Sequence, residues 1–271
     1  MKNFVVIGDP IKHSLSPVLH NWVFKSLNID ATYSQIHISQ NKLADCINEV
    51  RKGKLDGLNI TIPHKTSIIE YMDEVNPRAK SIGAINVVMF HNDKVIGNNT
   101  DWYGFVLALK NNRIDVHKKE VILLGAGGVS KGIIFALIQQ GVKKIYLFNR
   151  TFEKISHLRD ELIHPHKFEK LEELIKDNSI IINCTSVGLN SNISPIETTL
   201  LKKNQIIMDT IYTPLKTKLV MDAESAGART MTGLDMFIYQ ALASIDLWFG
   251  EGTTNKVNFE ELKGHIESYL C

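Results

Sequence analysis

A lysine and an aspartate in the first half of the chain are of the types that can move a proton. Lys65 follows Asn59, Thr61 and Pro63 at the end of an apolar stretch, and ligands of open α/β sheets bind outside the carboxyl ends of strands. Asp101 ends the polar turn GNNTD and could hold the lysine ammonium in position. The carboxylate favours the charged lysine while burial favours the neutral form, and the sequence leaves this balance open. The simpler interpretations are a surface lysine and a helix N-cap at Asp101, the second being compatible with a catalytic role.

A glycine turn in the middle of the chain is of the kind that holds a diphosphate. Residues 121–150 read VILLGAGGVSKGIIFALIQQGVKKIYLFNR, which is an apolar stretch, a glycine turn, a helical stretch and a second apolar stretch. Gly125, Gly127 and Gly128 let the backbone turn sharply, and the helix directs free N–H groups at a bound anion. The pattern departs from G-x-G-x-x-G because Ser130 takes the last position, so the alternative is a tight turn without ligand. The strand–turn–helix–strand context favours a dinucleotide site.

The residues after the second apolar stretch distinguish between the two nicotinamide cofactors. An NAD site usually has Asp or Glu at the end of this strand, where it binds the ribose hydroxyls. Here Asn149 and Arg150 stand there, with Thr151 and Lys154 close by. A guanidinium suits a 2′-phosphate because it offers planar donors and a permanent charge. NADP is therefore favoured over NAD, and the alternative is a surface arginine at a helix start.

Other polar residues give weaker signals. Ser14 and Ser16 offer two hydroxyls on one loop, suited to a carboxylate or a polyol, although loop serines commonly have no such role. Histidines 13, 20 and 64 show no metal-ligand spacing, so we interpret them as structural or exposed and expect no metal. Cys184 is interpreted as a buried filler.

Composition limits the class of protein. The length of 271 residues suits two domains. A net charge of +2 disfavours nucleic acid as a partner. Three dispersed cysteines without a CxxC pair indicate neither a disulfide framework nor a zinc site. The apolar run at residues 4–7 is too short for a signal peptide or a membrane span, so a reducing cytoplasm is the expected setting.

Alternating strands and helices must position these residues. The first part of the chain predicts strands at residues 4–7, 33–38 and 58–62, helices at 17–27 (N-cap Ser16), 43–50 and from His64–Lys65, and a hairpin through Asn92–Asp93. The second part predicts helices at residues 102–109, 152–162, 171–175, 216–226, 236–248 and 259–270, and strands at 179–183, 206–209 and 229–231. This order favours a mostly parallel α/β sheet in the first domain, and the last two helices are expected to fold back onto that domain.

The ordered set of motifs resembles the shikimate dehydrogenases, the NADP-dependent branch of the shikimate/quinate dehydrogenase family. The resemblance covers nearly the whole chain and is carried by GDPIKHSLSP, NITIPHK, IGAINVV, GNNTDWYG, GAGGVSKG, NRT, NCTSVGL, DTIYTPLKT and GLDMFIYQA. It implies reversible reduction of 3-dehydroshikimate to shikimate with NADPH, a step of aromatic amino acid biosynthesis. It also implies a substrate-binding α/β domain at residues 1–101, completed by helices of 236–271, and a Rossmann-like NADP-binding domain at 102–235.

The resemblance implies a role for individual residues. Lys65 and Asp101 correspond to the family's catalytic pair. The implied substrate groups are Ser14, Ser16 and Tyr212 for the carboxylate, and Thr61, Lys65, Asn86, Asp101 and Gln240 around the ring hydroxyls. The implied cofactor groups are Gly125, Ala126, Gly127, Gly128 and Val129 at the diphosphate, Asn149, Arg150, Thr151 and Lys154 at the adenosine phosphate, and Thr210 and Gly233 at the nicotinamide end.

Two residues depart from the family pattern. Val87 stands where Thr often follows the Asn of the GA-x-N-T motif, which would loosen contacts behind Asn86. Asp235 stands where G-L-G-M has glycine and adds a negative charge near the expected nicotinamide site.

Three other functions compete with this interpretation. A broader quinate/shikimate dehydrogenase using NAD is disfavoured by Arg150. A non-catalytic cofactor-binding module is disfavoured by the presence of Lys65, Asp101 and the serine pair. A dehydrogenase for a one-carbon folate carrier is disfavoured by the SLSP loop. The expected partner is a small-molecule substrate, with no nucleic acid and no membrane, and the expected assembly is a monomer or homodimer.

Overall fold

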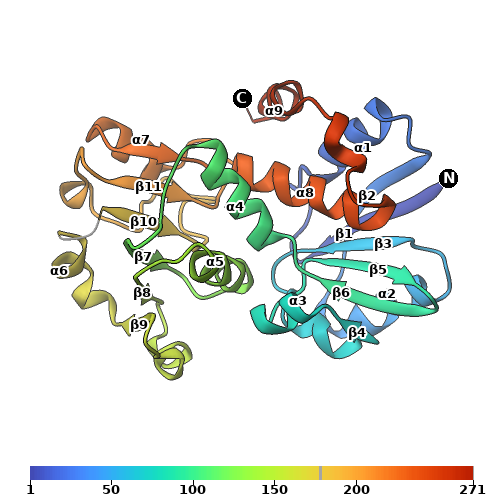
Figure 1. The fold of residues 1–271 in the computed structure, drawn as a ribbon, viewed down its shortest axis with the longest axis horizontal. Helices are drawn as coiled ribbons and strands as arrows, with labels where there is room; N and C mark the ends of the chain where they lie inside the picture. Colours follow the sequence, from blue (N-terminus) through green and yellow to red (C-terminus); the bar gives the residue numbers. More distant parts are fainter. Residues whose placement is uncertain (177–178, 271) are drawn as a thin grey trace. The chain divides into compact units, whose positions relative to one another are not determined.

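The chain folds into two compact units in the computed structural model, which describes residues 1–176 and 179–270 (Figure 1). The first unit comprises Met1–Gly104 and Ile238–Tyr269, and the second comprises Phe105–Phe237 and Leu270. The chain passes between them within two helices, α4 (Asp101–Asn111) and α8 (Leu234–Phe249). The expected return of the C-terminal helices to the first unit is confirmed.

The first unit is built on a six-stranded sheet with the order β2-β1-β3-β5-β6-β4. Its strands are β1 (Lys2–Gly8), β2 (Ala31–His37), β3 (Gly57–Ile60), β4 (Glu74–Val75), β5 (Val87–His91) and β6 (Lys94–Asn98). β1 pairs in parallel with β2 and β3, while the β5–β6 hairpin pairs antiparallel with β3 and within itself. Asn92 and Asp93 have φ angles of 49° and 59°, as a two-residue hairpin turn requires. The predicted hairpin is confirmed.

Helices cover this sheet with their apolar faces. The helices wholly in this unit are α1 (Ser16–Ser26), α2 (Leu43–Arg51), α3 (Pro77–Ile82) and α9 (Phe259–Glu267). In α2 the buried side chains are Leu43, Cys46, Ile47 and Val50, the spacing of one helical face. Trp248 of α8 stacks on Phe4 at 4.4 Å between ring centroids, and its Nε1 donates to the Val88 carbonyl at 3.1 Å. These contacts fix α8 on the sheet.

The second unit contains a six-stranded parallel sheet with the order β12-β11-β10-β7-β8-β9. Its strands are β7 (Glu120–Leu124), β8 (Lys144–Phe148), β9 (Ile163–His166), β10 (Ile180–Asn183), β11 (Ile206–Asp209) and β12 (Arg229–Met231). Consecutive strands run outward from β7 in one direction and from β10 in the other. This reversal is the switch point at which dinucleotides bind in such sheets, so the Rossmann-like fold is confirmed.

The helices of the second unit depart from expectation in one region. α5 (Gly128–Gln139), α6 (Leu171–Ile175) and α7 (Lys218–Ser225) lie where helices were expected. The helix expected at 152–162 is wrong, because the chain forms short 3-10 helices at Phe152–Lys154 and Ser156–Leu158 and then β9. The Asp160 carboxylate accepts the N–H groups of Leu162 and Ile163, which turns the chain into the strand. Pro165 is tolerated because β9 is an edge strand.

Two helix starts in the first unit also differ from expectation. Leu15, not Ser16, is the N-cap of α1, and the Ser14 Oγ accepts the Ser16 N–H at 3.3 Å. The helix expected from His64 begins only at Ser67, as the 3-10 helix Ser67–Tyr71. Among the described residues, no helix combines the length and apolar character needed to cross a membrane.

Candidate active site

Lys65 and Asp101 form a buried ion pair in the first unit. Lys65 Nζ lies 2.6 Å from Asp101 Oδ2, and the two side chains are 9% and 5% exposed. Lys65 lies in the turn after β3, and Asp101 begins α4, where the helix dipole favours a carboxylate. The Asp101 N–H donates to Asn99 Oδ1 at 3.0 Å, which fixes the start of the helix. Burying both charges is tolerable because each has its partner, and the result is an oriented ammonium that can donate a proton.

Asn86 connects this pair to Gln240, which is 154 residues further along the chain. The Asn86 Nδ2 donates to Asp101 Oδ1 at 2.9 Å and to Gln240 Oε1 at 3.2 Å. Asn86 is 2% exposed, and its Oδ1 accepts the Thr100 N–H at 2.7 Å. Hydrogen bonds therefore join Lys65, Asp101, Asn86 and Gln240, the four residues that the family resemblance assigns to one site.

Ser14, Ser16 and Thr61 lie at the same edge of the sheet. Thr61 follows the end of β3, and the serine loop follows the end of β1, its parallel neighbour. The two loops approach closely, since a Cβ placed on Gly8 would lie 2.5 Å from the Thr61 methyl carbon. Lys65 and Asp101 follow β3 and β6 at this edge as well, so all five side chains belong to the carboxyl end of the sheet.

The glycine turn of the second unit has the geometry of an anion site. Gly125 follows β7 with φ +97°, a conformation that favours glycine, and a Cβ there would lie 2.9 Å from the Cys184 carbonyl. A Cβ on Gly127, the N-cap of α5, would meet nothing within 4 Å. The backbone therefore faces open space at the N-terminus of a twelve-residue helix, which fits a diphosphate. Ala126 and Val129 complete this turn.

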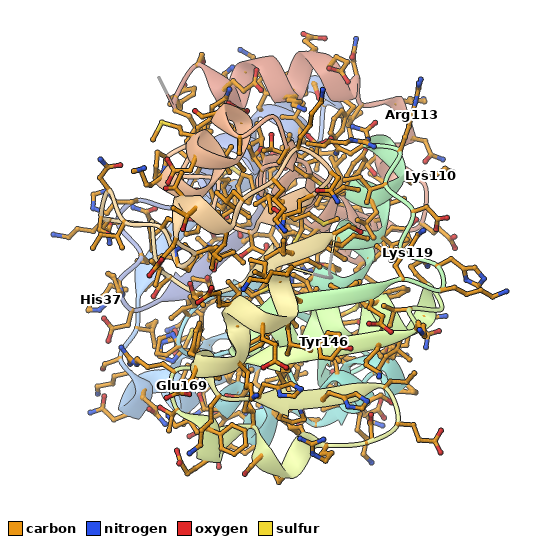
Figure 2. The ribbon with its side chains drawn as sticks, turned by 90° about the vertical axis from the view of Figure 1, so that its left-hand side faces the viewer. His37, Lys110, Arg113, Lys119, Tyr146 and Glu169 are labelled. Carbon is orange, nitrogen blue, oxygen red and sulfur yellow. The ribbon has the colours of Figure 1, made fainter. Side chains whose placement is uncertain are left out.

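The residues after β8 supply positive charge at the same edge of the second sheet. Arg150 and Lys154 are exposed, and Asn149 Nδ2 donates to the Thr151 carbonyl at 2.8 Å. Figure 2 labels other exposed cations, Lys110, Arg113 and Lys119, along the right-hand edge of the view, and Lys119 directly precedes β7, at the opposite end of that strand from the glycine turn. Of these two groups of cations, Arg150 and Lys154 follow the carboxyl end of β8, the strand next to β7. An adenosine phosphate would lie at that end.

Thr210 and Gly233 touch one another at the ends of β11 and β12. A Cβ on Gly233 would lie 2.2 Å from the Thr210 carbonyl oxygen, so only glycine fits there. Thr210 Oγ1 donates to the Asn183 carbonyl at 3.0 Å. Asp235 is 4% exposed, and its Oδ2 accepts from Asn111 and Asn112 at the end of α4. The charge expected near Gly233 is thus compensated by two amides.

Tyr212, which the resemblance assigns to the substrate carboxylate, belongs to the second unit, as do the cofactor residues. Its ring stacks on Phe237 with centroids 4.2 Å apart and an interplanar angle of 17°. Burial raises the pKa of the Tyr212 hydroxyl to about 12, so it is a hydrogen-bond donor at neutral pH. Its role toward the substrate carboxylate stays a prediction.

Three polar residues behind the site carry no functional signal in the sequence, where Asn59 is only part of a strand. Asn59, Thr100 and Ser244 are 6%, 3% and 0% exposed and are hydrogen-bonded to one another and to Asn86. Val87 is 1% exposed, and Asn86 keeps its contacts with Thr100 despite this departure.

The histidines and cysteines that the structure describes are mostly buried or isolated side chains. His20 and His64 are buried and His13 is exposed. Burial raises the thiol pKa of Cys184 above its ordinary value and that of Cys46 to about 11. Within residues 1–176 and 179–270, no group of three or more His, Cys, Asp or Glu side chains could hold a metal ion.

Comparisons with known proteins match both units. The family model "Shikimate dehydrogenase substrate binding domain" matches residues 6–88, and "Shikimate / quinate 5-dehydrogenase" matches residues 107–208. The shikimate dehydrogenase (NADP(+)) of Bacillus cereus (strain G9842) is 38% identical, over 96% of this chain and 98% of its own length. That of Staphylococcus haemolyticus (strain JCSC1435) is 42% identical over 92% of each chain.

Solved structures of the same kind are also similar. Shikimate dehydrogenase from Aquifex aeolicus superposes with a TM-score of 0.90 at 35% identity, covering 98% of this chain and 97% of its own. The shikimate 5-dehydrogenase of Thermus thermophilus, in complex with NADP(H) and shikimate, gives 0.87 at 29% identity and 99% of each chain.

Proposed function

We propose that this chain, which belongs to the shikimate dehydrogenase family, uses Lys65 and Asp101 as its catalytic pair. It is an NADP-dependent oxidoreductase that interconverts 3-dehydroshikimate and shikimate. The observation that carries the assignment is the buried ion pair with a 2.6 Å separation, joined through Asn86 to Gln240 at the strand-end edge.

The residues of the first unit account for the proton and for substrate orientation. NADPH, when bound, supplies the hydride that reduces the carbonyl carbon. Lys65 donates a proton from Nζ to the carbonyl oxygen as it becomes a hydroxyl, and takes it back in the oxidation of shikimate. Asp101 holds Lys65 Nζ in place through the hydrogen bond to its Oδ2. Asn86, Gln240 and Thr61 orient the ring hydroxyls, and the groups that bind the carboxylate are Ser14, Ser16 and Tyr212.

The second unit provides the cofactor side. We assign residues 102–235 to NADP binding and residues 1–101, with helices of 236–271, to substrate binding. The open backbone at Gly127 and the helix N-terminus that follows support the diphosphate position. The exposed Arg150 and Lys154 support selection of the 2′-phosphate. The nicotinamide end is assigned to Thr210 and Gly233.

We further propose that the protein works in the cytoplasm as a monomer or homodimer with a small-molecule substrate. Two observations support the cytoplasm as the setting. Cys46 and Cys184 are free thiols, and the proposed reaction belongs to biosynthesis. Light scattering during gel filtration would determine which assembly is present.

Replacement of the proposed acid tests the function directly. Lys65→Ala should lower the turnover of NADP⁺-dependent shikimate oxidation by about 10²-fold or more, while the KM for shikimate changes much less, because the lysine acts mainly in proton transfer. The measurement is NADPH absorbance at saturating shikimate. Lys42→Ala, an exposed lysine paired with Asp45, is the control and should keep full turnover. Wild-type turnover in Lys65→Ala would remove the lysine from the mechanism.

Substrate choice is tested in the same assay. Rates with shikimate should exceed those with quinate, and rates with NADPH those with NADH. A clear preference for NADH would favour the broader quinate/shikimate activity instead. NADPH binding without any turnover would favour a cofactor-binding module.

A further inference from the structure

We infer that Thr100 and Ser244 are positioning residues, whose hydroxyls fix the amide of Asn86 and thereby the direction in which Asp101 faces Lys65. The inference rests on the proposed function, because Asn86, Asp101 and Lys65 belong to the proposed site. Thr100 and Ser244 are 3% and 0% exposed, so water does not reach them freely and their hydrogen bonds must be made within the protein.

A chain of buried hydrogen bonds leads from the edge of the sheet to Asn86. The Tyr33 hydroxyl of β2 donates to Asn59 Oδ1 at 2.7 Å. Asn59 Nδ2 donates to the Asn86 carbonyl at 3.1 Å and to Ser244 Oγ at 3.0 Å. Ser244 Oγ lies 3.2 Å from Thr100 Oγ1. Side chains from β2, β3, α8 and the turn before α4 thus meet in one network.

The partners of each group restrict where its protons go. Ser244 donates its only hydroxyl proton to the Gln240 carbonyl at 2.9 Å and accepts from Asn59, so the Thr100 hydroxyl proton goes to Ser244 Oγ at 3.2 Å or to Asn86 Oδ1 at 3.3 Å. Thr100 then has a lone pair for Asn86 Nδ2, which lies 3.0 Å away. The Thr100 N–H donates to Asn86 Oδ1 at 2.7 Å. The Asn86 amide is therefore held at both ends and cannot flip.

The held amide determines how the catalytic pair is oriented. Asn86 Nδ2 has two protons and three acceptors within reach, Thr100 Oγ1 at 3.0 Å, Asp101 Oδ1 at 2.9 Å and Gln240 Oε1 at 3.2 Å. The Thr100 hydroxyl therefore takes part in determining which way each N–H points. Asp101 Oδ2 is then presented to Lys65 Nζ at 2.6 Å. Loss of the Thr100 hydroxyl removes one acceptor of Asn86 Nδ2 and the hydroxyl partner of Ser244 Oγ in a dry environment. The Asn86 N–H groups are then shared between Asp101 and Gln240 alone, which alters the hydrogen bond that orients Asp101.

A purely structural role would have a different signature, which a matched threonine can reveal. Thr254 is also buried, at 9% exposure, and its hydroxyl donates to Asp246 Oδ2 at 3.0 Å beyond the end of α8. Thr254→Val also removes a buried threonine hydroxyl and its hydrogen bond in the same unit, but it does so outside the network. It should lower the melting temperature and leave kcat, KM and the pH profile unchanged.

The test compares variants with and without the hydroxyl. Thr100→Val and Ser244→Ala should each lower kcat for shikimate oxidation by about 10-fold, the effect of losing one buried hydrogen bond. The KM for shikimate should change less than kcat. Thr100→Ser keeps the hydroxyl and should return kcat to within about 2-fold of wild type. The pH dependence of kcat should shift in Thr100→Val and not in Thr254→Val, because only the first alters the surroundings of Asp101.

Tyr33→Phe keeps the test decisive if a core variant fails to fold. It removes one hydroxyl at the outer end of the network and keeps the ring that stacks on His20. It should give a smaller loss of kcat than Thr100→Val. The inference would be overturned if Tyr33→Phe and every core variant that folds kept the wild-type kcat, KM and pH profile. These variants are measured beside an inactive Lys65→Ala. Wild-type turnover of Lys65→Ala would instead overturn the proposed function on which it rests.

Discussion

At the scale of single residues, the environment of a charge separates the proposed catalytic pair from the other ion pairs of the chain. Lys94 and Glu74 form an ion pair with about half of each side chain exposed, where pairing contributes little. Lys65 and Asp101 are almost fully enclosed, so each would be strongly disfavoured without the other. A buried ion pair therefore calls for a role that a surface pair does not have, and proton transfer to a substrate is such a role.

Arg150 allows a residue-scale prediction about cofactor choice. Arg150→Ala should raise the KM for NADPH by about 10-fold or more, because it removes a charge-assisted hydrogen bond to the 2′-phosphate. The KM for NADH, which lacks that phosphate, should stay the same. Steady-state kinetics with both cofactors measures the change.

The control for this variant is Lys143→Ala. Lys143 is an exposed cation of the same unit that pairs with Glu120, before β8. It should leave both KM values unchanged. An equal rise for NADPH and NADH in Arg150→Ala would show that the arginine contributes to folding or general affinity and not to phosphate recognition.

At the scale of elements, the sequence was most informative where a buried strand or an amphipathic face repeats. β7 is 0% exposed over Val121, Ile122, Leu123 and Leu124, so its apolar run was visible. α6, β11 and β12 begin and end where predicted. The irregular segment after Arg150 was not predictable, because its path depends on Asp160 accepting local N–H groups and on β9 pairing with β8. Neither interaction leaves a periodic pattern in the sequence.

The close approach of β11 and β12 allows a prediction at this scale. Gly233→Ala should lower the free energy of unfolding by about 1–3 kcal/mol, because the new methyl group would overlap the Thr210 carbonyl and force the backbone apart. NADP⁺ affinity should fall with it, since both residues are assigned to the nicotinamide end. Urea unfolding and a cofactor titration measure the two effects.

Gly264→Ala is the matched control. A Cβ there would meet nothing within 4 Å, and the residue lies within α9. This change should leave activity intact and raise the free energy of unfolding by up to about 1 kcal/mol, since alanine is the better helix former. Equal stability of Gly233→Ala and wild type would show that the two strand ends can separate without loss.

At the scale of the whole molecule, the site depends on residues brought together from distant parts of the chain. The hydrogen bond between Asn59 and Ser244 joins positions 185 residues apart. Motifs identified Lys65, Asn86, Asp101 and Gln240 one at a time, and their family resemblance indicated a common role. The sequence contained no periodic signal that α8 would place a serine against β3, because that contact exists only after the chain returns to the first unit. The NADP-dependent activity, in contrast, is confirmed by the relatives.

His20 couples the stability of the first unit to pH. Its ring is 0% exposed, stacks on Tyr33 at 3.9 Å and donates from Nδ1 to the Ser16 carbonyl at 2.8 Å. Burial lowers the pKa of His20 from 6.5 to about 3. In the unfolded chain the histidine binds a proton as pH falls below 6.5, while the folded protein binds it only near pH 3. The contribution to stability is therefore complete above pH 6.5 and is lost as the pH falls through that window, by up to about 1.4 kcal/mol per pH unit.

Urea unfolding at pH 7 and pH 5 tests this coupling. Between pH 7 and pH 5, the free energy of unfolding should fall by about 2 kcal/mol more in the wild type than in His20→Phe. This variant keeps a stacked ring and cannot be protonated. His20→Phe should be less stable than wild type at pH 7, because the Ser16 carbonyl loses its donor. The exposed His13, changed to Gln, should keep the wild-type dependence. The same loss between pH 7 and pH 5 in His20→Phe and wild type would mean that the buried ring accepts its proton without opening the fold.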